Sequence, residues 1–161
     1  MTINIEDDQR RIYGVEGQVD YFFTDSEWST GANFNAIKSQ TRVDGKWKKL
    51  TVDSASPSKM SAWVTWAPGD WTLRLQSTQT FDLSDEAGKK IDGYNTVDLL
   101  GSYLLPVGKL SFSVENLLDE DYTTAWGQRA PGLYSPTYGA ENLYTYKGRG
   151  RTFGLNYSVV F

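Results

Sequence analysis

The residue types that carry most enzyme chemistry are missing from this chain. It contains no histidine and no cysteine among its 161 residues, which excludes Ser-His-Asp and Cys-His catalysis, disulfides, thiolate metal sites and the usual zinc sites. We therefore expect neither an enzyme nor a resident metal or other cofactor. Lysine and arginine are scattered and the net charge is −4, so a nucleic-acid surface is not expected either.

Arg74 is the charged side chain with the most informative position. It lies midway along residues 71–81, where Trp71, Leu73 and Leu75 alternate with polar residues. A charge on the lipid face of a membrane strand costs about 2 to 4 kcal/mol near the bilayer midplane. If this segment crosses a membrane, Arg74 must therefore face the lumen of a barrel. In a soluble sandwich it would be an ordinary solvent-exposed strand residue.

The end of the chain also alternates, and its pattern is the strongest evidence for a membrane strand. Within residues 147–161, small or polar residues separate five apolar side chains, which are Phe153, Leu155, Tyr157, Val159 and the terminal Phe161. Because the side-chain period of a strand is two, one face of this segment is a continuous apolar stripe, as a lipid-facing barrel strand requires. The alternative is a buried terminal strand of a soluble β protein.

The overall composition agrees with a β-barrel but not with membrane helices. The mean hydropathy is −0.49, and no stretch approaches the roughly 20 consecutive apolar residues of a transmembrane helix. Low hydropathy is compatible with a barrel, since only alternate residues face lipid. The aromatic content of 14% suits aromatic girdles at the membrane interfaces.

Six further segments alternate in the same way, at residues 9–23, 28–36, 59–66, 71–81, 94–105 and 110–115. The connections are short after the first, third and fifth segments, and long after the others, at about 42–58, 82–92 and 116–146. Outer-membrane barrels have short periplasmic turns and long extracellular loops. We therefore predict an all-β, antiparallel up-and-down sheet of roughly seven strands that is part of a transmembrane β-barrel, with the last strand ending in the periplasm.

Two observations predict that the chain is a piece of a longer exported protein. Single-chain bacterial barrels have even strand numbers, whereas the count here is odd. The residues after Met1 are polar and lack the basic and apolar regions of a secretory signal.

Residues 113–122 narrow the family. An Asn-Leu pair followed by an acidic cluster and a tyrosine resembles the motif after the penultimate strand of TonB-dependent outer-membrane siderophore receptors. The matching residues are Glu115, Asn116, Leu117, Leu118, Asp119, Asp121 and Tyr122. Residues 92–105 resemble the antepenultimate strand, and residues 123–161 resemble the carboxyl end of members that take up citrate-hydroxamate siderophores of the aerobactin type.

The resemblance covers essentially the whole chain and implies the carboxyl-terminal part of a plugged barrel with roughly 22 strands. It implies TonB-energised import of a ferric siderophore across the outer membrane of a Gram-negative bacterium, with iron held by the siderophore. It also implies that the alternating last strand is the signal read by the barrel-assembly machinery. We find no plug domain and no TonB box in residues 1–161, so we expect contact with TonB only through other parts of the receptor and no transport by this piece alone. Its open sheet edges predict self-association.

For an anionic, oxygen-rich siderophore, the resemblance implies a pocket of basic and aromatic side chains. The ligand-binding candidates are Arg129, Trp126, Tyr134, Tyr138, Tyr144, Trp47 and Arg74, with Gln128, Tyr146, Lys48 and Lys49 nearby in the same loops. Arg149 and Arg151 are expected near the outer rim, where phosphate groups of lipopolysaccharide or the neighbouring strand would pair with them. Girdle packing and solvated loop positions are the competing interpretations.

Two alternatives belong to other classes. One is a small complete outer-membrane barrel, such as a lipid-modifying enzyme, which the lack of histidine and the odd strand count disfavour. The other is a soluble up-and-down barrel that binds an apolar ligand in its interior. That barrel would enclose the apolar face, with Tyr13, Phe34, Trp71, Phe112 and Tyr157 inside.

Overall fold

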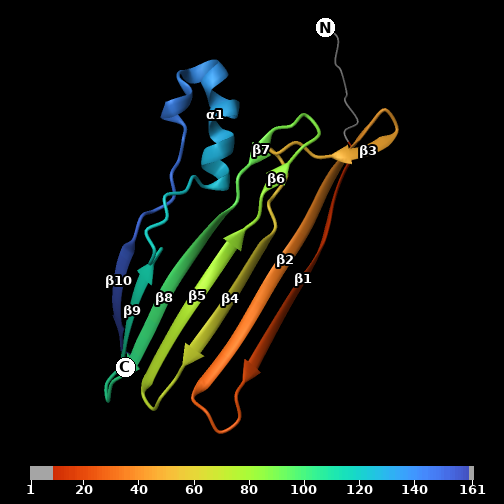
Figure 1. Ribbon diagram of the computed structural model, residues 1–161. Helices are drawn as coiled ribbons and strands as arrows, with labels where there is room; N and C mark the ends of the chain where they lie inside the picture. The colour runs from red at the N-terminus through yellow and green to blue at the C-terminus, as the bar shows by residue number, and fades with distance from the viewer. Residues whose placement is uncertain (1–8, 160–161) are drawn as a thin grey trace.

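Seven long strands form one antiparallel sheet whose order follows the chain (Figure 1). The computed structural model describes residues 9–159. Across the sheet the strands are β1 (Arg10–Phe22), β2 (Trp28–Val43), β4 (Lys59–Trp66), β5 (Trp71–Thr80), β8 (Tyr94–Leu104), β9 (Lys109–Glu115) and β10 (Thr152–Ser158). The short strand β3 (Lys46–Lys49) pairs with β2. The prediction of an all-β, up-and-down sheet is confirmed.

The register keeps apolar side chains on one face across the whole sheet. Val19 of β1 pairs with Ala32 of β2, and Ala32 pairs in turn with Ala62 of β4. At the far edge Phe112 of β9 pairs with Leu155 of β10. Directly paired residues project to the same face, and a slip of one residue would turn a whole strand over. The alternating pattern therefore fixes the pairing.

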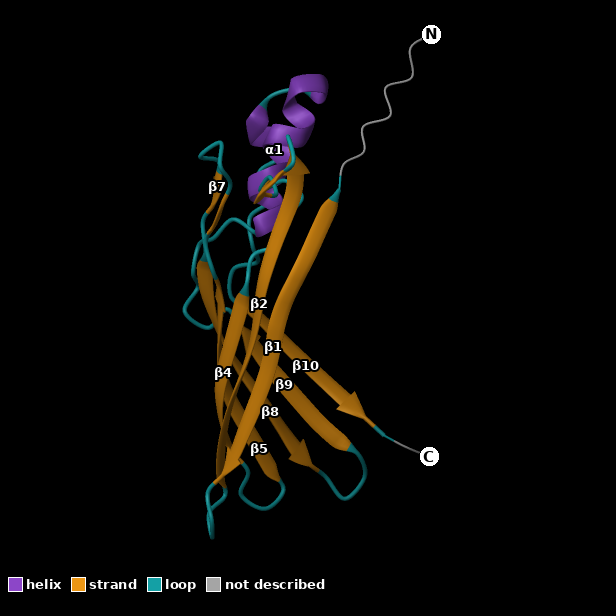
Figure 2. Ribbon diagram, turned by 90° about the vertical axis from the view of Figure 1, so that its right-hand side faces the viewer, coloured by secondary structure: helices purple, strands orange, loops and turns teal. Residues whose placement is uncertain are grey.

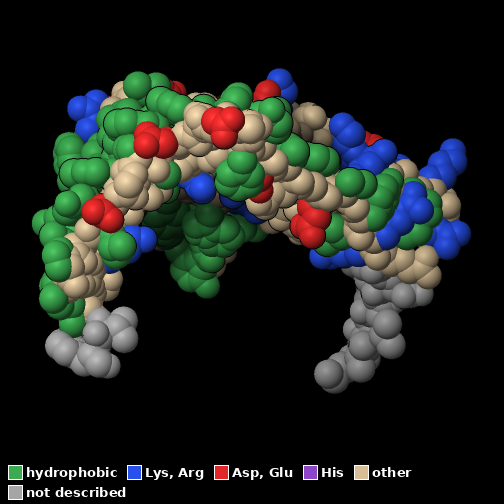
Figure 3. All heavy atoms as spheres, turned by 90° about the horizontal axis from the view of Figure 1, so that it is seen from below, with side chains coloured by type: hydrophobic (Ala, Val, Ile, Leu, Met, Phe, Trp, Pro, Cys, Tyr) green, Lys and Arg blue, Asp and Glu red, His purple; other side chains and the backbone are tan. Residues whose placement is uncertain are grey.

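The apolar face lies on the outside of a curved sheet. Seen from the end with the short turns, hydrophobic side chains cover much of the outside of an arch, and lysine and arginine side chains are visible in its hollow (Figure 3). The side chains of Phe153 and Leu155 are 73% and 77% exposed, so no other part of the described chain covers them. An apolar surface of this extent needs lipid or a protein partner against it.

The sheet is open within the described residues. β1 and β10 are its two edges and do not pair with each other, and the views in Figures 2 and 3 show a trough. The soluble-barrel alternative requires strands that enclose the apolar face, whereas the described strands leave that face uncovered.

All short turns lie at one end of the sheet and all long connections at the other (Figures 1 and 2). The turn after β4 begins at Pro68, whose carbonyl accepts a hydrogen bond from the Trp71 N–H at 3.0 Å. Gly69 in this turn and Gly108 in the turn before β9 have positive φ angles of 54° and 93°, which glycine adopts without strain. The predicted alternation of short and long connections is confirmed.

The long connections contain more structure than the sequence predicts. β2 continues to Val43 and forms a hairpin with β3 across Asp44 and Gly45. The next connection contains β6 (Leu83–Ser84) paired with β7 (Lys90–Ile91). The last contains α1 (Ala125–Tyr138) and the 3-10 helix η1 (Glu141–Leu143). Within residues 9–159, no helix has the length and apolarity needed to cross a membrane.

Most of the buried apolar side chains lie at the loop end and not in the sheet. They are Leu50, Val52, Ala55, Ile91 and Ala130, together with Trp63 of β4. The connections therefore pack on one another around a small core of their own. We call this unit, made of residues 50–58, β6 and β7, and α1, the loop module.

Candidate functional site

The helix α1 begins at a polar cap that the chain supplies itself. The Thr124 hydroxyl accepts a hydrogen bond from the Gly127 N–H at 3.0 Å and donates one to the Tyr146 carbonyl at 3.1 Å. Gly127 stands against the backbone of Tyr146, where a Cβ would have no room. Capping by threonine satisfies an otherwise unpaired helix N–H, and it ties the start of α1 to the returning chain.

Gln128 anchors α1 to the connection that carries β7. Its side-chain carbonyl accepts a hydrogen bond from the Asp92 N–H at 2.7 Å, and its amide donates to the Asp92 carbonyl at 2.9 Å. The amide also donates to the Thr123 carbonyl at 3.0 Å. These bonds occupy both ends of the side chain, so Gln128 positions the helix.

Arg129 fastens α1 to residues 50–58. Its Nη2 donates a hydrogen bond to the Ala55 carbonyl, while its buried Nε has no hydrogen-bond partner among the described residues. Burial lowers the pKa of the guanidinium, and the nearby carboxylate of Asp53 acts in the opposite direction. Asp53 itself pairs with Lys89 at 2.7 Å. Arg129 is therefore engaged within the loop module.

Four of the aromatic candidates form one cluster on α1 and directly after η1. The ring of Tyr134 lies 6.2 Å from Trp126, 6.5 Å from Tyr138 and 5.6 Å from Tyr144. The Tyr144 hydroxyl donates to the Tyr138 carbonyl at 3.0 Å. The side chains of Trp126 and Tyr138 are 48% and 70% exposed. This aromatic cluster offers ring faces and hydroxyl groups to a ligand that approaches from the loop end.

Trp47 lies apart from the aromatic cluster, on β3 at the other side of the loop end (Figure 1). The guanidinium of Arg11 lies 4.1 Å from the centre of its ring, within the range of a cation-π contact. The seven candidates therefore do not form a single site.

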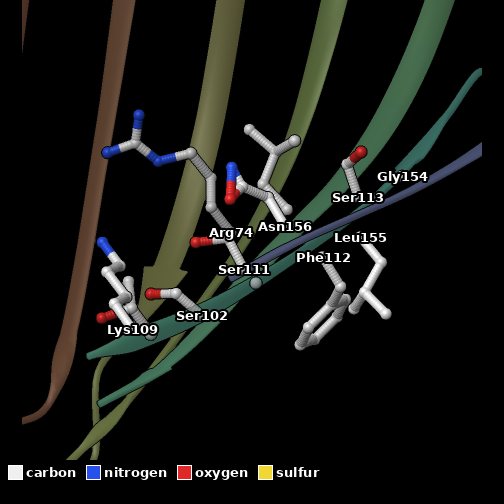
Figure 4. A pocket seen from close by; sticks show the side chains of 12 residues that line it. Arg74, Ser102, Lys109, Ser111, Phe112, Ser113, Gly154, Leu155 and Asn156 are labelled. Atoms are coloured by element: carbon white, nitrogen blue, oxygen red, sulfur yellow. The ribbon is translucent and has the colours of Figure 1, made fainter. Parts of the chain in front are cut away.

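Arg74 lies in the sheet, on the predicted polar face. Its Nε donates a hydrogen bond to the Thr65 hydroxyl at 3.1 Å. Figure 4 shows Arg74, Lys109 and Asn156 on one side of the sheet, whereas Phe112 and Leu155 project to the other side. These residues line a shallow groove of about 490 Å³. Arg74 thus places a positive charge in the hollow of the sheet.

Trp63 is the sheet residue that the alternating pattern does not single out. It projects to the polar face yet is only 7% exposed, and the Arg74 guanidinium lies 5.2 Å from its ring centre. Gly31 is its partner across the ladder, and a Cβ there would come within 2.6 Å of the Trp63 ring. A glycine across from a tryptophan leaves room for the large ring to lie flat on the neighbouring strand.

The Asn-Leu motif forms a clasp that joins the end of β9 to its neighbours. Asn116 is 4% exposed, and its amide donates to the carbonyls of Glu120 at 2.9 Å and Arg149 at 3.0 Å. Its side-chain carbonyl accepts from the Glu120 N–H at 2.9 Å. Its own N–H donates to the carboxylate of Asp98 on β8 at 2.8 Å. Every hydrogen-bonding group of the side chain is therefore used inside the protein.

Four further motif residues complete this clasp. Asp119 accepts a hydrogen bond from the Arg151 N–H at 2.8 Å, just before β10. Asp121 pairs with Lys147 at 2.8 Å, and Leu117 donates its N–H to the Val97 carbonyl at 2.6 Å. Tyr122 stacks on Tyr94 with ring centres 4.3 Å apart. Leu118 is 68% exposed.

The surroundings of Tyr122 raise the pKa of its phenol. Burial is the largest cause that raises its pKa, followed by the neighbouring Tyr94 and the carboxylates of Asp98 and Glu115. All of these disfavour a negative charge on the phenol. The clasp therefore favours the protonated form of Tyr122.

The last strand is shorter than the apolar pattern suggests. β10 begins at Thr152 and ends at Ser158, with Phe153, Leu155 and Tyr157 on the apolar face. Val159 follows the strand and is half-buried. Phe161, the predicted end of the assembly signal, lies outside the described residues.

Comparison of the sequence with known proteins also indicates an outer-membrane receptor barrel. The profile of a family described as "TonB dependent receptor-like, beta-barrel" matches residues 1–117. The ferric aerobactin receptors of Escherichia coli and Klebsiella pneumoniae are each 65% identical to the chain over 161 residues. The rhizobactin receptor of Rhizobium meliloti (strain 1021) is 35% identical over 163 residues. The chain is aligned throughout but spans only 22% of the length of each relative.

A solved structure supports the fold. The copper transporter OprC superimposes with a TM-score of 0.66 and 24% sequence identity, over 89% of this chain and 22% of that chain. At this identity the likeness concerns the fold alone. The matched family and relatives are receptors and not enzymes.

Proposed function

Because the chain belongs to the TonB-dependent receptor-like β-barrel family, we propose that it forms part of the barrel wall and outer loops of a receptor that imports a ferric siderophore across the outer membrane. The observation that carries this proposal is 65% identity with ferric aerobactin receptors over the whole chain. Relatives of this family are outer-membrane proteins of Gram-negative bacteria and work with TonB. The siderophore proposed is of the aerobactin class, a citrate-hydroxamate.

The arrangement of the sheet supports this role. One face is apolar and uncovered, and the opposite face carries Arg74 and other polar side chains in the hollow. Such a sheet separates lipid from a polar lumen when it is completed into a barrel. We therefore place the short turns in the periplasm and the loop module outside the cell.

The aromatic cluster is the part of the loop module best suited to contact the siderophore. Trp126, Tyr134, Tyr138 and Tyr144 lie together and remain partly exposed. A ferric siderophore presents oxygen-rich, anionic edges and apolar segments, and tyrosine side chains can contact both. Arg129 helps to position this cluster, because it attaches α1 to residues 50–58. Iron stays coordinated by the siderophore, so no metal ligand from the protein is required.

The last strand is proposed to be read by the barrel-assembly machinery. Its outward side chains Phe153, Leu155 and Tyr157 are all more than half exposed, as expected for a strand that presents an apolar stripe to a partner or to lipid. Away from a complete barrel, the open edges at β1 and β10 would favour self-association.

A segment exchange tests the proposed function. In the Escherichia coli ferric aerobactin receptor, the aligned segment is replaced by residues 1–161 of this chain, and we call the product the hybrid receptor. It is produced in a strain that lacks its own receptor, with ferric aerobactin as the sole iron source. We expect growth close to that given by the unmodified receptor, with an unrelated ferric siderophore as the negative control.

Two outcomes would contradict the proposal at different levels. A hybrid receptor that is absent from the outer membrane would contradict the placement of this chain in such a barrel. A hybrid receptor that assembles normally but neither binds ferric aerobactin nor supports growth would contradict the siderophore assignment. Heat modifiability on a gel separates these cases, because assembled barrels migrate differently before and after boiling.

A further inference from the structure

We propose that a basic cluster on the outward face of β1, β2 and β3 binds the phosphate groups of the glycolipid in the outer leaflet. The cluster consists of Arg11, Lys38, Arg42 and Lys49, arranged around Gln40. The inference rests on the membrane orientation of the proposed function, since that orientation places the loop end of the sheet at the outer leaflet. It concerns a surface that lies away from the aromatic cluster.

The strand register places the four cations on one face. Gln40 pairs with Arg11 on one side and with Lys49 on the other. Lys38 and Arg42 are two residues away along the same strand, so they project to the same face as Gln40. With strands about 4.8 Å apart and alternate residues about 7 Å apart, all four cations surround Gln40 as close neighbours.

This face is the apolar one. Arg11 lies an even number of residues before Val15 and Val19 along β1, so the three side chains project to the same face, and the register between Arg10 and Phe22 is unbroken. Val15 and Val19 are 66% and 64% exposed on the outside of the arch. The cations therefore stand directly above the lipid-facing band, on the same side of the sheet.

The spacing along β2 fits the thickness of a membrane. Trp28, at the end with the short turns, stacks on Trp66 with ring centres 5.9 Å apart. Lys38 follows Trp28 by ten residues on the same face, which corresponds to about 33 Å along the strand. With a strand tilt of about 40°, this separation becomes about 25 Å along the membrane normal, the height of the apolar band of such barrels. The basic cluster then lies at the level of the outer headgroups.

Contacts with neighbouring side chains fix the guanidinium of Arg11 and leave some of its N–H donors for an anion. Its guanidinium lies 4.1 Å from the ring centre of Trp47 and 5.7 Å from that of Tyr13. Its Nε donates a hydrogen bond to the Gln40 side-chain carbonyl at 2.9 Å, which Tyr13 also contacts through its hydroxyl at 3.2 Å. The guanidinium has five N–H donors, so the remaining ones can serve a phosphate in the paired geometry that arginine favours.

One carboxylate in the described part of the chain contacts the cluster: that of Glu86, which accepts a hydrogen bond from the Lys49 backbone N–H at 3.2 Å. The four cations therefore keep a net positive charge. The acidic residues of these three strands are Glu16 and Asp20 of β1, and both project to the opposite face. The two ion pairs found among the described residues, Asp53–Lys89 and Asp121–Lys147, lie elsewhere. A cationic surface at the headgroup level attracts anionic lipid, and tryptophan and tyrosine at the same level suit an interface.

The chain supplies a matched control within β3. Lys46 and Lys48 alternate with Trp47 and Lys49, so they project to the opposite face. One variant of the hybrid receptor carries Lys38→Gln with Lys49→Gln, and the control carries Lys46→Gln with Lys48→Gln. Both variants lose two positive charges close to the same hairpin, but only the first loses them from the outward face.

The test measures binding of bis-phosphorylated lipid A to the purified hybrid receptor in detergent, by native mass spectrometry. We expect Lys38→Gln with Lys49→Gln to weaken binding about 30-fold, in line with about 1 kcal/mol for each basic residue near an anionic surface. The control variant should stay within about twofold of the parent, and dephosphorylated lipid A should bind weakly to all three proteins. Equal losses in the two variants, or no loss in the first, would overturn the proposal.

Two further measurements complete the test. One distinguishes a lipid phosphate from free phosphate, and the other distinguishes a failure of the lipid site from a failure of the proposed function. Inorganic phosphate that competes fully at millimolar concentration would overturn a lipid site in favour of a simple anion site. Growth on ferric aerobactin should be unchanged in both variants, so a failed uptake assay with intact lipid binding would count against the proposed function alone. If the hybrid receptor does not assemble, the same titration is made on the 161-residue chain in detergent micelles, where the same contrast between the variants is required.

Discussion

The ring of Tyr122 covers the backbone of Gly148 so closely that no side chain fits on Gly148. The Gly148 N–H donates a hydrogen bond to the Tyr122 carbonyl at 2.8 Å, and the Tyr122 ring stacks on the ring of Tyr94 of β8. This contact joins the chain after β9 to the chain that returns into β10. It is therefore a point where the last strand is fixed to the sheet.

Substitution of Gly148 should loosen this attachment. We expect Gly148→Ala in the hybrid receptor to cost about 1 to 3 kcal/mol, because the methyl group must displace an aromatic ring or the backbone. Unfolding in urea, followed by tryptophan fluorescence, measures this loss. Gly132→Ala is the control, since a Cβ there meets only the flexible end of the Lys89 side chain. Equal stability of the two variants would contradict the clasp.

Asn116 should be the most sensitive residue of the clasp. Asn116→Ala removes three side-chain hydrogen bonds, each partly buried, and leaves their backbone partners unpaired, so we expect a loss of about 2 to 4 kcal/mol. Asn116 also has a φ angle of 50°, which alanine tolerates poorly. Asn116→Gly keeps this conformation and should be less harmful by about 1 kcal/mol. Urea unfolding of both variants separates the two effects, and a harmless Asn116→Ala would refute the role given to this side chain.

The alternating pattern predicted the sheet well because a strand that separates two environments must repeat with period two. Val19, Leu75 and Leu155 therefore lie on the predicted face. The helix α1 was not predictable in this way, since Gly127 and Pro131 both disfavour a helix interior. Its formation depends on contacts that are distant in sequence.

The candidate site was likewise predictable only in part. Trp126 and Tyr138 come together only because α1 exists, and the sequence shows no helical period there that would group them. Trp47 and Arg74 share the residue types of a ligand pocket, but register and loop geometry place them elsewhere. Local patterns identify which face a strand residue occupies, whereas the meeting of different loops depends on tertiary packing.

The loop module should open locally when Arg129 is replaced. In Arg129→Met the carbonyl of the buried residue Ala55 loses its donor, and we expect about 1 to 3 kcal/mol less protection of residues 50–58. Hydrogen exchange of these amides in the hybrid receptor measures the change. Lys89→Gln removes a more exposed ion pair and should change protection by less than about 1 kcal/mol. A larger effect of Lys89→Gln would show that the ion pair, and not Arg129, holds the module.

Tyr122 should make stability depend on pH in the alkaline range. Burial, followed by Tyr94, Asp98 and Glu115, raises its pKa above the ordinary value of 10.0. The unfolded chain then releases the proton at a lower pH than the folded protein, so stability is fully present below about pH 10 and falls as the pH rises above it. The urea midpoint of the wild type should fall between pH 9 and pH 11, whereas that of Tyr122→Phe should fall less. The difference between the two proteins is then smaller at pH 11 than at pH 9. An identical alkaline loss in the two proteins would assign it to other groups.

The two faces of β5 give the sharpest test of the membrane assignment. Leu75 is 49% exposed on the apolar face, and its neighbour Gln76 projects to the polar face with Arg74. Leu75→Arg places a charge toward lipid and should cost about 2 to 4 kcal/mol, so little of this variant of the hybrid receptor should reach the heat-modifiable, assembled form. Gln76→Arg adds the same charge one residue later but toward the hollow, and assembly should stay near that of the parent. Because both variants introduce the same side chain and add the same charge, the main difference between them is the environment of each face. If both variants assemble equally well, the apolar face does not contact lipid.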